Sequence, residues 1–317
     1  MRSANALAQS ALLDCCHGAD AVVLMRLGID LGGTKIEAVL MDAQGDLLHR
    51  ERVPTPSHSY EAILETIGQL VCKLERTFAV SANIGIGTPG SLSAETGLMR
   101  NSNTLCLNCR PLQRDLEKVL GRELRLANDA NCFALSEATD GAAEGAESVF
   151  GVILGTGVGG GLVFRNQLLS GVNGIAGEWG HNRLSETDEQ RLCYCGRRDC
   201  IETHLCGAGL LQTYRQFGGT LTSVPELVAA AERGDGVSCR SLEHYCHDLA
   251  RALAQVINIF DPEVIVLGGG LSNIPCLYQR VPELWMHWVF SDHCRTQLRA
   301  NRFGDSSGVR GAARLWP

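Results

Sequence analysis

Two glycine-rich turns of similar design, about 123 residues apart, constrain the fold of this chain more than any other feature. The first turn, Gly32-Gly33-Thr34-Lys35, follows the largely apolar segment Leu-Gly-Ile-Asp-Leu at residues 27–31 and precedes a second apolar run. The second turn, Gly155-Thr156-Gly157, likewise joins two apolar runs. Each pattern predicts a strand, a tight turn and a returning strand. Because a spacing this long does not fit a solenoid repeat, the pair indicates a duplicated domain.

Both turns suit the binding of phosphate. Glycine permits positive φ and lets backbone amides approach an anion closely. Thr34 and Thr156 add hydroxyl donors, and Lys35 adds a positive charge. The chain has no P-loop pattern, and no G-x-G-x-x-G enters a helix as in dinucleotide-binding folds. Two ordinary hairpins are the alternative, but their matched design favours phosphate binding.

A third glycine cluster ends a run of Val, Ile and Leu within residues 261–270. A continuous apolar run between proline and glycine predicts a buried parallel strand. Gly268 and Gly269, at its carboxyl end, would leave room for a flat ligand such as adenine. A plain strand-to-helix turn explains the same residues equally well.

One histidine and three cysteines within twenty positions have the spacing of a zinc site: His181, Cys193, Cys195 and Cys200. Buried thiols are the alternative for the C-x-C pair alone, but the added cysteine and histidine favour zinc. Glu178 and Glu202 flank the four residues. We therefore expect a metal-folded loop that presents carboxylates to a substrate.

Asn128 and Asp129 stand where a predicted strand passes into a helix. Asp129 is expected near the helix N-terminus, where Asp and Asn are the preferred caps. A general base that takes a proton from a sugar hydroxyl is the functional alternative. Both roles are compatible, because a helix N-terminus favours the ionised carboxylate.

Composition excludes several classes of protein. With a net charge of −7 and no basic block, a nucleic-acid partner is not expected. No apolar run reaches the roughly 18 residues of a membrane span. The chain has 14 cysteines, but its 317 residues make it long for a disulfide scaffold. A reducing, cytoplasmic location is therefore expected. Residues 1–24 are expected to be a disordered extension or an upstream start, with a targeting segment as the alternative.

Helical apolar spacing marks residues 60–80 and 241–260, and residues 82–90 predict a strand that ends in a turn. Strands that alternate with helices indicate an α/β protein with mixed sheets.

In their order along the chain, these motifs resemble those of the ROK sugar kinases, from about Met25 to the C-terminus. The resemblance is carried by Asp30 with the first turn, Asn128-Asp129, the second turn, Gly177-Glu178-Trp179-Gly180-His181 and residues 193–202. Details at residues 193–196, 201–203 and 304–313 are most similar to the bacterial fructokinase and mannokinase branch. The resemblance implies a two-domain actin-like ATPase (ribonuclease H-like) fold with an active-site cleft between the domains and a zinc-binding loop.

The resemblance also implies roles for individual residues. Asp129 would be the catalytic base, and Asp30 would help to hold Mg²⁺. The two turns would bind the phosphates of ATP, and Gly268 and Gly269 would border its adenosine. The residues implied to bind sugar hydroxyls are Asn103, Asn128, Asp129, Glu178, His181 and Glu202. Zn²⁺ would be held by His181, Cys193, Cys195 and Cys200, with the second imidazole nitrogen of His181 facing the sugar.

The implied N-terminal domain covers residues 25–128 and is joined by the C-terminal helix, about residues 304–317. The larger domain covers residues 129–303, with the zinc clip at residues 181–200 and a hinge near residues 129–140. A homodimer is the family expectation. Two departures stand out: Asp199 occupies a position where the family usually has glycine, which predicts some strain, and the loop of residues 185–192 is short.

The expected activity is phosphorylation of D-fructose to D-fructose 6-phosphate by ATP. A kinase for an N-acetylated hexosamine, or for glucose or mannose, is the alternative. A sugar-sensing regulator of the same family would need an N-terminal DNA-binding domain of roughly 60–80 residues, which the residues before the first strand are too few to form.

Overall fold

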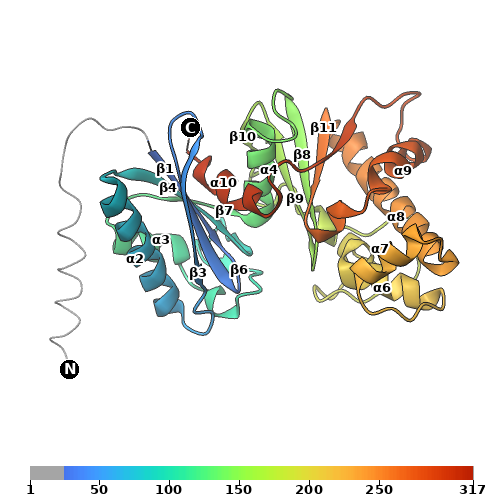
Figure 1. Cartoon of the computed structure of the whole chain (residues 1–317), viewed down its shortest axis with the longest axis horizontal. Helices are drawn as coiled ribbons and strands as arrows, with labels where there is room; N and C mark the ends of the chain where they lie inside the picture. Colours follow the sequence, from blue (N-terminus) through green and yellow to red (C-terminus); the bar gives the residue numbers. More distant parts are fainter. Residues whose placement is uncertain (1–24, 317) are drawn as a thin grey trace. The chain divides into compact units, whose positions relative to one another are not determined.

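The computed structural model describes residues 25–316, which form two compact units (Figure 1). The first unit contains the described residues up to Cys132, together with Val172–Gly174 and the chain from Gly308 onward. The second unit contains Phe133–Gly171 and Ile175–Ser307. The unit boundary therefore lies at Cys132, close to the limit expected at residue 128. The expectation for residues 1–24 lies outside the described residues.

The first unit is built on a sheet of five strands in the order β3-β2-β1-β4-β7. The strands are β1 (Met25–Leu31), β2 (Lys35–Met41), β3 (Leu47–Pro54), β4 (Ala82–Thr88) and β7 (Arg125–Asn128). β1, β2 and β3 form an antiparallel meander, whereas β4 and β7 extend the sheet in parallel from β1. The first glycine-rich turn is the β1–β2 hairpin.

The second unit repeats this design in the order β10-β9-β8-β11-β12. The strands are β8 (Ser148–Leu154), β9 (Val158–Phe164), β10 (Gln167–Leu168), β11 (Val264–Gly268) and β12 (Gln297–Ala300). Again three strands are antiparallel, and the last two extend the sheet in parallel. The duplication predicted from the two turns is therefore confirmed at the level of strand order and direction.

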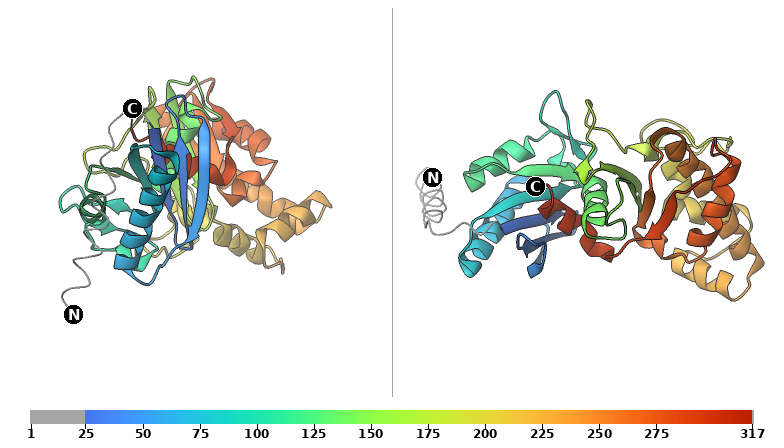
Figure 2. Two further views of the ribbon diagram at one scale, coloured as in Figure 1. Left: turned by 60° about the vertical axis from the view of Figure 1, so that its left-hand side comes forward. Right: turned by 90° about the horizontal axis from the view of Figure 1, so that it is seen from above.

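The two faces of β2 show how the first sheet is covered (Figure 2). Ile36, Ala38 and Leu40 pack into one core, whereas the alternate residues Val39 and Met41 pack with α10 (Ser307–Ala313). This alternation follows from the two-residue period of a strand. The α10 backbone lies so close to the sheet that Cβ atoms would clash at the paired strand glycines Gly28 and Gly85, 2.2 and 1.9 Å from carbonyl oxygens of α10.

The other face of the first sheet carries α2 (Tyr60–Phe78) and α3 (Leu112–Leu120). Ser59 caps α2 by accepting a hydrogen bond from the Ala62 amide at 3.2 Å. The shorter elements of this unit are β5 (Ser91–Leu92), β6 (Met99–Arg100) and the 3-10 helix η1 (Leu105–Leu107).

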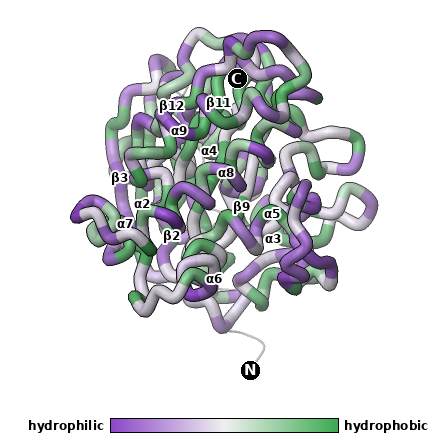
Figure 3. Tube along the Cα trace, turned by 90° about the vertical axis from the view of Figure 1, so that its right-hand side faces the viewer, coloured by the Kyte–Doolittle hydropathy of each residue, from purple (hydrophilic) through white to green (hydrophobic). Residues whose placement is uncertain are grey.

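Helices of the second unit alternate hydrophilic and hydrophobic segments along their length (Figure 3). They are α4 (Asp129–Thr139), which begins in the first unit, α5 (Ile201–Leu205), α6 (Gly207–Gln216), α7 (Val224–Glu232), α8 (Gly236–Phe260) and α9 (Leu277–Leu284). The short 3-10 helices are η2 (Trp179–His181), η3 (Gly270–Asn273), η4 (Trp285–His287) and η5 (Gly304–Ser306). Apolar residues of α5 to α9 form one core with β8 and β11. Among residues 25–316, no helix has the length and apolar character needed to cross a bilayer.

Candidate functional site

The β1–β2 hairpin presents exposed backbone at its tip. The Gly32 amide donates to the Lys35 carbonyl at 3.0 Å, and Thr55 braces the turn by donating its hydroxyl to the Gly32 carbonyl at 2.7 Å. Gly33 and Thr34 are exposed. Lys35 Nζ lies 3.9 Å from a carboxylate oxygen of Glu37, and its side chain remains 43% exposed. An exposed turn with a cation beside it is suited to an anion.

The β8–β9 hairpin is joined to the expected sugar-binding acid Glu202. The Gly155 amide donates to the Gly157 carbonyl at 3.0 Å and closes the turn, and Thr156 is exposed. Glu202 Oε2 accepts a hydrogen bond from the Val158 amide at 2.9 Å. A Cβ at Gly157 would lie only 2.7 Å from the same oxygen. A side chain at Gly157 would therefore displace the Glu202 carboxylate from this hydrogen bond.

These turns do not use the positive φ that glycine permits. Among the described residues, neither Gly32 and Gly33 nor Gly155 and Gly157 has positive φ. Their absent side chains instead make room: the turn at Gly155 faces open space, and Gly157 admits Glu202.

At the end of β11, the glycines pack against protein rather than open space. A Cβ at Gly268 would lie 2.4 Å from the Phe133 ring, and one at Gly269 would lie 2.3 Å from the Leu154 carbonyl oxygen. Gly269 has φ of 79°, which favours glycine. Gly269 thus packs against the backbone of Leu154, the last residue of β8 before the turn. A Cβ at Gly270, the next residue, would face open space.

Asp30, near the end of β1, is a carboxylate whose ionisation is costly at its buried position. Burial, together with the nearby charges of Asp129 and Glu37, raises its pKa to about 6, and Lys35 offsets only part of this effect. Gly87 and Gly308 lie close to its two oxygens, where Cβ atoms would be 3.8 and 3.6 Å away. A divalent cation would relieve the cost of ionising this carboxylate, so the residue fits the expected magnesium site.

Asn128, rather than Asp129, caps α4. Asn128 Oδ1 accepts from the Asn131 amide at 2.7 Å, as an N-cap side chain does. Asp129 is the first helical residue, is exposed, and accepts from the Ala130 amide through Oδ1 at 2.8 Å. The cap expected at Asp129 is therefore shifted by one residue, because the side chain that spans to the third helical amide is that of Asn128.

Asn103 is exposed on a loop of the first unit that reaches the β1–β2 hairpin. Asn108 braces this loop through hydrogen bonds in both directions with the Ser102 backbone, each 2.9 Å. The next residue, Thr104, is 4% exposed, and its hydroxyl has no hydrogen-bond partner among residues 25–316. It lies 3.4 Å from the Cβ position of Gly33. Sequence reasoning missed Thr104, since only the folded loop brings it to the hairpin.

The segment of Glu178 and His181 lies against β9 at very short range. A Cβ at Gly180 would lie 2.3 Å from the Val158 carbonyl, and one at Gly160 would lie 2.8 Å from the Trp179 ring. Trp179 is buried and donates its indole N–H to the Gly159 carbonyl at 3.1 Å. The glycines of β9 therefore allow this segment to pack closely against the strand. Glu178 is exposed and His181 is half-buried.

The four expected zinc ligands converge in the second unit. One ligand atom from each of His181, Cys193, Cys195 and Cys200 lies within 4.8 Å of all the others. Cys193 Sγ is 3.6 Å from His181 Nδ1, and Cys195 Sγ is 3.6 Å from Cys200 Sγ. Tetrahedral zinc with Zn–S bonds of about 2.3 Å separates its sulfur ligands by about 3.8 Å. These residues can therefore hold a metal ion with little rearrangement.

The second imidazole nitrogen of His181 contacts Tyr194, a residue for which no role was expected from the sequence. His181 Nε2 is 2.9 Å from the hydroxyl of Tyr194, and the two rings meet edge to face at 5.1 Å. Burial, together with Glu202, Cys193 and Glu178, raises the pKa of Tyr194 to about 12. The phenol thus stays protonated at neutral pH.

Asp199 has φ of 54°, so the position does require left-handed backbone. Its side chain is fully buried and well bonded. Its carboxylate accepts from the amides of Gln190 and Arg191 at 3.2 and 2.9 Å, and His204 Nε2 lies 3.3 Å away. Although burial acts in the opposite direction, the backbone hydrogen bonds lower the pKa of Asp199.

The short loop of residues 185–192 is fastened through Arg191, which is 4% exposed. Its guanidinium donates to the Thr203 and Gly209 carbonyls at 3.0 and 3.1 Å and pairs with Glu189. Together with Asp199, these bonds connect the loop to α5, the helix that carries Glu202.

We expect Asp199 to stabilise the protein despite its backbone. Asp199→Gly removes the strain and also the carboxylate, which leaves the buried amide of Arg191 and the amide of Gln190 without this acceptor, so it should lower the free energy of unfolding by about 2 kcal/mol. Asp199→Ala keeps the strain and should cost about 1 kcal/mol more. Urea denaturation measures both values. A glycine variant more stable than the natural protein would show that strain dominates at this position.

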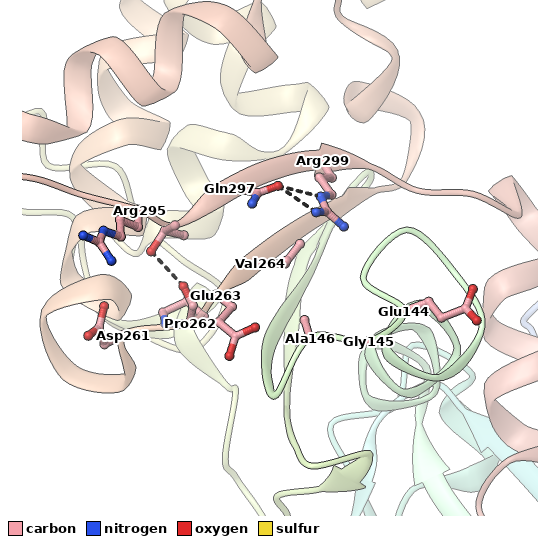
Figure 4. Close-up of a pocket in the computed structure, with 11 residues that line it drawn as sticks. Glu144, Gly145, Ala146, Asp261, Pro262, Glu263, Val264, Arg295, Gln297 and Arg299 are labelled. Carbon is pink, nitrogen blue, oxygen red and sulfur yellow. Dashed lines mark hydrogen bonds between the residues drawn. The ribbon is translucent and has the colours of Figure 1, made fainter.

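A cavity of about 550 Å³ lies at the amino ends of β11 and β12, where Val264 and Gln297 line it (Figure 4). Gly268 lies at the opposite end of β11, away from this cavity. Two polar side chains of the cavity are hydrogen-bonded within the protein: Thr296 donates to the Pro262 carbonyl at 2.7 Å, and Arg299 donates to Gln297. The charged residues of the cavity have both signs, so we assign it no ligand.

Comparison with known proteins agrees with this geometry. The sequence model of the ROK family matches residues 26–317. The chain is 40% identical over 301 residues to the N-acetyl-D-glucosamine kinase of Pasteurella multocida. The alignment covers 92% of this chain and 99% of that relative. The ROK hexokinase from Thermus thermophilus has a TM-score of 0.82 at 33% identity, over 92% and 97% of the two chains. A ROK glucokinase from Streptomyces griseus, solved with glucose and AMPPNP, has a TM-score of 0.73 at 28% identity, over 92% and 98%.

Two matched sheets with paired glycine hairpins therefore define an α/β protein of the actin-like ATPase type, with the fold of a sugar kinase. The chain belongs to the ROK family. The resemblance predicted this family correctly, but the expected fructokinase branch is not supported, because the relatives at 40% and 39% identity are N-acetyl-D-glucosamine kinases. The cleft between domains, the homodimer, the cytoplasmic location and the roles of individual residues stay predictions.

Proposed function

We propose that this protein is an ATP-dependent N-acetyl-D-glucosamine kinase. The observation that supports this substrate is the 40% identity to a kinase of that name over nearly the whole of both chains. The fructose hypothesis depended on short motifs around the cysteine cluster. Those motifs build the loop and do not measure the width of a sugar pocket, so they distinguish substrates less well than similarity over the whole length.

In this proposal, Asp129 is the general base that accepts the proton of the attacking sugar hydroxyl. Its place as the first residue of α4, with Asn128 as the cap, leaves its carboxylate exposed to a substrate. The β1–β2 and β8–β9 hairpins hold the phosphates of ATP through backbone amides. Asp30 would help to hold Mg²⁺, which supplies positive charge that neutralises the transferring phosphoryl group. Gly268 and Gly269 border the adenosine.

The sugar is bound by Asn103, Asn128, Glu178, His181 and Glu202 in this proposal. Carboxylates and amides suit a hexose, because its surface consists largely of hydroxyl groups that need acceptors and donors. Glu202 has a second task, since one of its oxygens already holds the Val158 amide of the β8–β9 hairpin. A single carboxylate therefore connects the sugar site with the phosphate site.

Zinc, held by His181, Cys193, Cys195 and Cys200, would fasten this loop. Its chemistry here would be structural, because a set of three cysteines and one histidine leaves no open ligand position. The chain's own bonds through Asp199 and Arg191 support the same loop from the other side.

A sugar panel tests the proposed function. We expect ATP-dependent phosphorylation of N-acetyl-D-glucosamine with a kcat/KM at least about tenfold above that for glucose, mannose, N-acetylmannosamine and fructose, a difference of about 1.4 kcal/mol in transition-state binding. ADP release measures the rate, and mass spectrometry of the sugar phosphate excludes simple ATP hydrolysis. A preference for fructose or glucose would contradict the proposed specificity, and no turnover of any of these hexoses would contradict the proposed reaction.

A further inference from the structure

Tyr194 is an exposed aromatic residue between two of the clustered cysteines. It occupies a tight turn in which the Gly196 amide donates to the Cys193 carbonyl at 2.9 Å. Its exposed fraction is 78%. Tyrosine at such exposure lacks the burial that usually stabilises an aromatic ring, and in a binding surface it supplies both an apolar face and a polar tip.

The side chain is nevertheless held in one direction. Its hydroxyl lies 2.9 Å from His181 Nε2, and its ring meets the imidazole edge to face at 5.1 Å with an interplanar angle of 86°. Two contacts of different kinds with the same histidine orient the phenol without burying it.

The position of this hydroxyl matters because of how His181 is turned. His181 Nδ1 faces the Cys193 sulfur at 3.6 Å, so Nδ1 is the nitrogen directed at the cysteine cluster. Nε2 is the nitrogen left to face a substrate, and the Tyr194 hydroxyl is in contact with it. A sugar that approaches His181 therefore meets the phenol as well.

The surrounding charges place the phenol among the acids proposed to bind the sugar. Both Glu202 and Glu178 are near enough to act on it electrostatically. Glu202 is itself held by the Val158 amide. All of these residues belong to the second unit, so the argument does not depend on how the two units are arranged.

We propose that Tyr194 is a further sugar-binding residue, whose hydroxyl, oriented by His181, hydrogen-bonds to a polar group of the hexose. A phenol both donates and accepts hydrogen bonds, so it can contact a hydroxyl or an amide group. The inference rests on the proposed function only in requiring that the substrate is a hexose.

Tyr194→Phe tests this role, since it keeps the ring and removes only the hydroxyl. We expect the KM for the sugar to rise about tenfold, the effect of one lost hydrogen bond, with kcat and the KM for ATP changed less than about twofold. Calorimetric titration of the sugar without ATP should show the same loss in affinity independently of turnover. A residue that merely supported the loop would instead lower the bound metal and change both KM values.

Tyr60→Phe is the matched control. It removes a phenol hydroxyl that donates to Asp115 at 3.0 Å in the first unit, and it should leave sugar binding unchanged. A sugar KM and affinity within twofold of the natural protein for Tyr194→Phe would overturn the inference, as would a loss of metal parallel to the loss of affinity. If the natural protein prefers another hexose, the proposed specificity fails, but the same comparison made with that hexose still tests Tyr194.

Discussion

Replacing Asp129 with asparagine is expected to lower kcat by about 10²–10⁴-fold, the usual contribution of a general base. Asparagine has nearly the same shape but cannot accept the proton of the sugar hydroxyl. The fold should tolerate the change, because the cap of α4 is made by Asn128 and Asp129 is exposed. Steady-state kinetics should show the loss in kcat with little change in the KM for ATP, and thermal unfolding should be nearly unchanged.

Glu61→Gln provides the matched control for Asp129→Asn. Glu61 is also an exposed carboxylate in the first turn of a helix, α2. Its neutralisation should leave kcat within about twofold of the natural value. An Asp129→Asn variant with activity close to that of the control would show that the proton of the sugar leaves by another route.

Cys200→Ser is expected to release the metal and to lower the free energy of unfolding by about 3–5 kcal/mol, as the loss of a structural metal does. Cys200 is buried, its sulfur lies 3.6 Å from that of Cys195, and it immediately precedes α5, which carries Glu202. The sugar KM should therefore rise more than about tenfold, because the proposed sugar acids lose their positions. Elemental analysis, chemical denaturation and sugar kinetics on one preparation measure all three effects.

Cys239→Ser separates this effect from the loss of any thiol. Cys239 is exposed on α8, and its sulfur contacts only the Ala231 carbonyl at 3.4 Å among the hydrogen bonds of the described residues. This variant should keep its metal, stability and activity. A natural protein that carries no zinc, or that keeps its stability and sugar KM after chelation, would refute a structural metal in the cluster.

The regular elements were predictable because their signals are local. The helix expected at residues 60–80 is α2, which Ser59 caps, and the strand expected at residues 82–90 is β4. The helix expected at residues 241–260 begins earlier, at Gly236, because Asp235 caps it by accepting from the Ser238 amide at 2.8 Å. Its first turn, Gly-Val-Ser-Cys, is too short and mixed to show an apolar period, so the cap defines where it begins.

The glycines show where local signals end. Gly157 was expected to serve the turn and its phosphate, and the structure shows in addition that it faces the Glu202 carboxylate. Gly160, on β9, is likewise opposed by a side chain from elsewhere in the chain, that of Trp179. A sequence shows that a position lacks a side chain, but it does not show which atoms fill the space. Thr104 and Tyr194 were missed for the same reason: Thr104 belongs to no motif, Tyr194 lies within the cysteine motif without an expected role of its own, and each acts through a neighbour brought to it by folding.

Several strands and helices, the two hairpins and the cluster of four candidate zinc ligands followed from spacing along the chain, because turns and short ligand clusters involve residues that are close in the sequence. Convergence of distant residues required the folded chain. Glu202 reaches Val158, the Asp199 carboxylate binds the Arg191 amide, and the Tyr194 hydroxyl meets His181 only once β9, the cysteine loop and α5 have packed together. Such contacts depend on the path of the backbone through the core, and no local period of the sequence records that path.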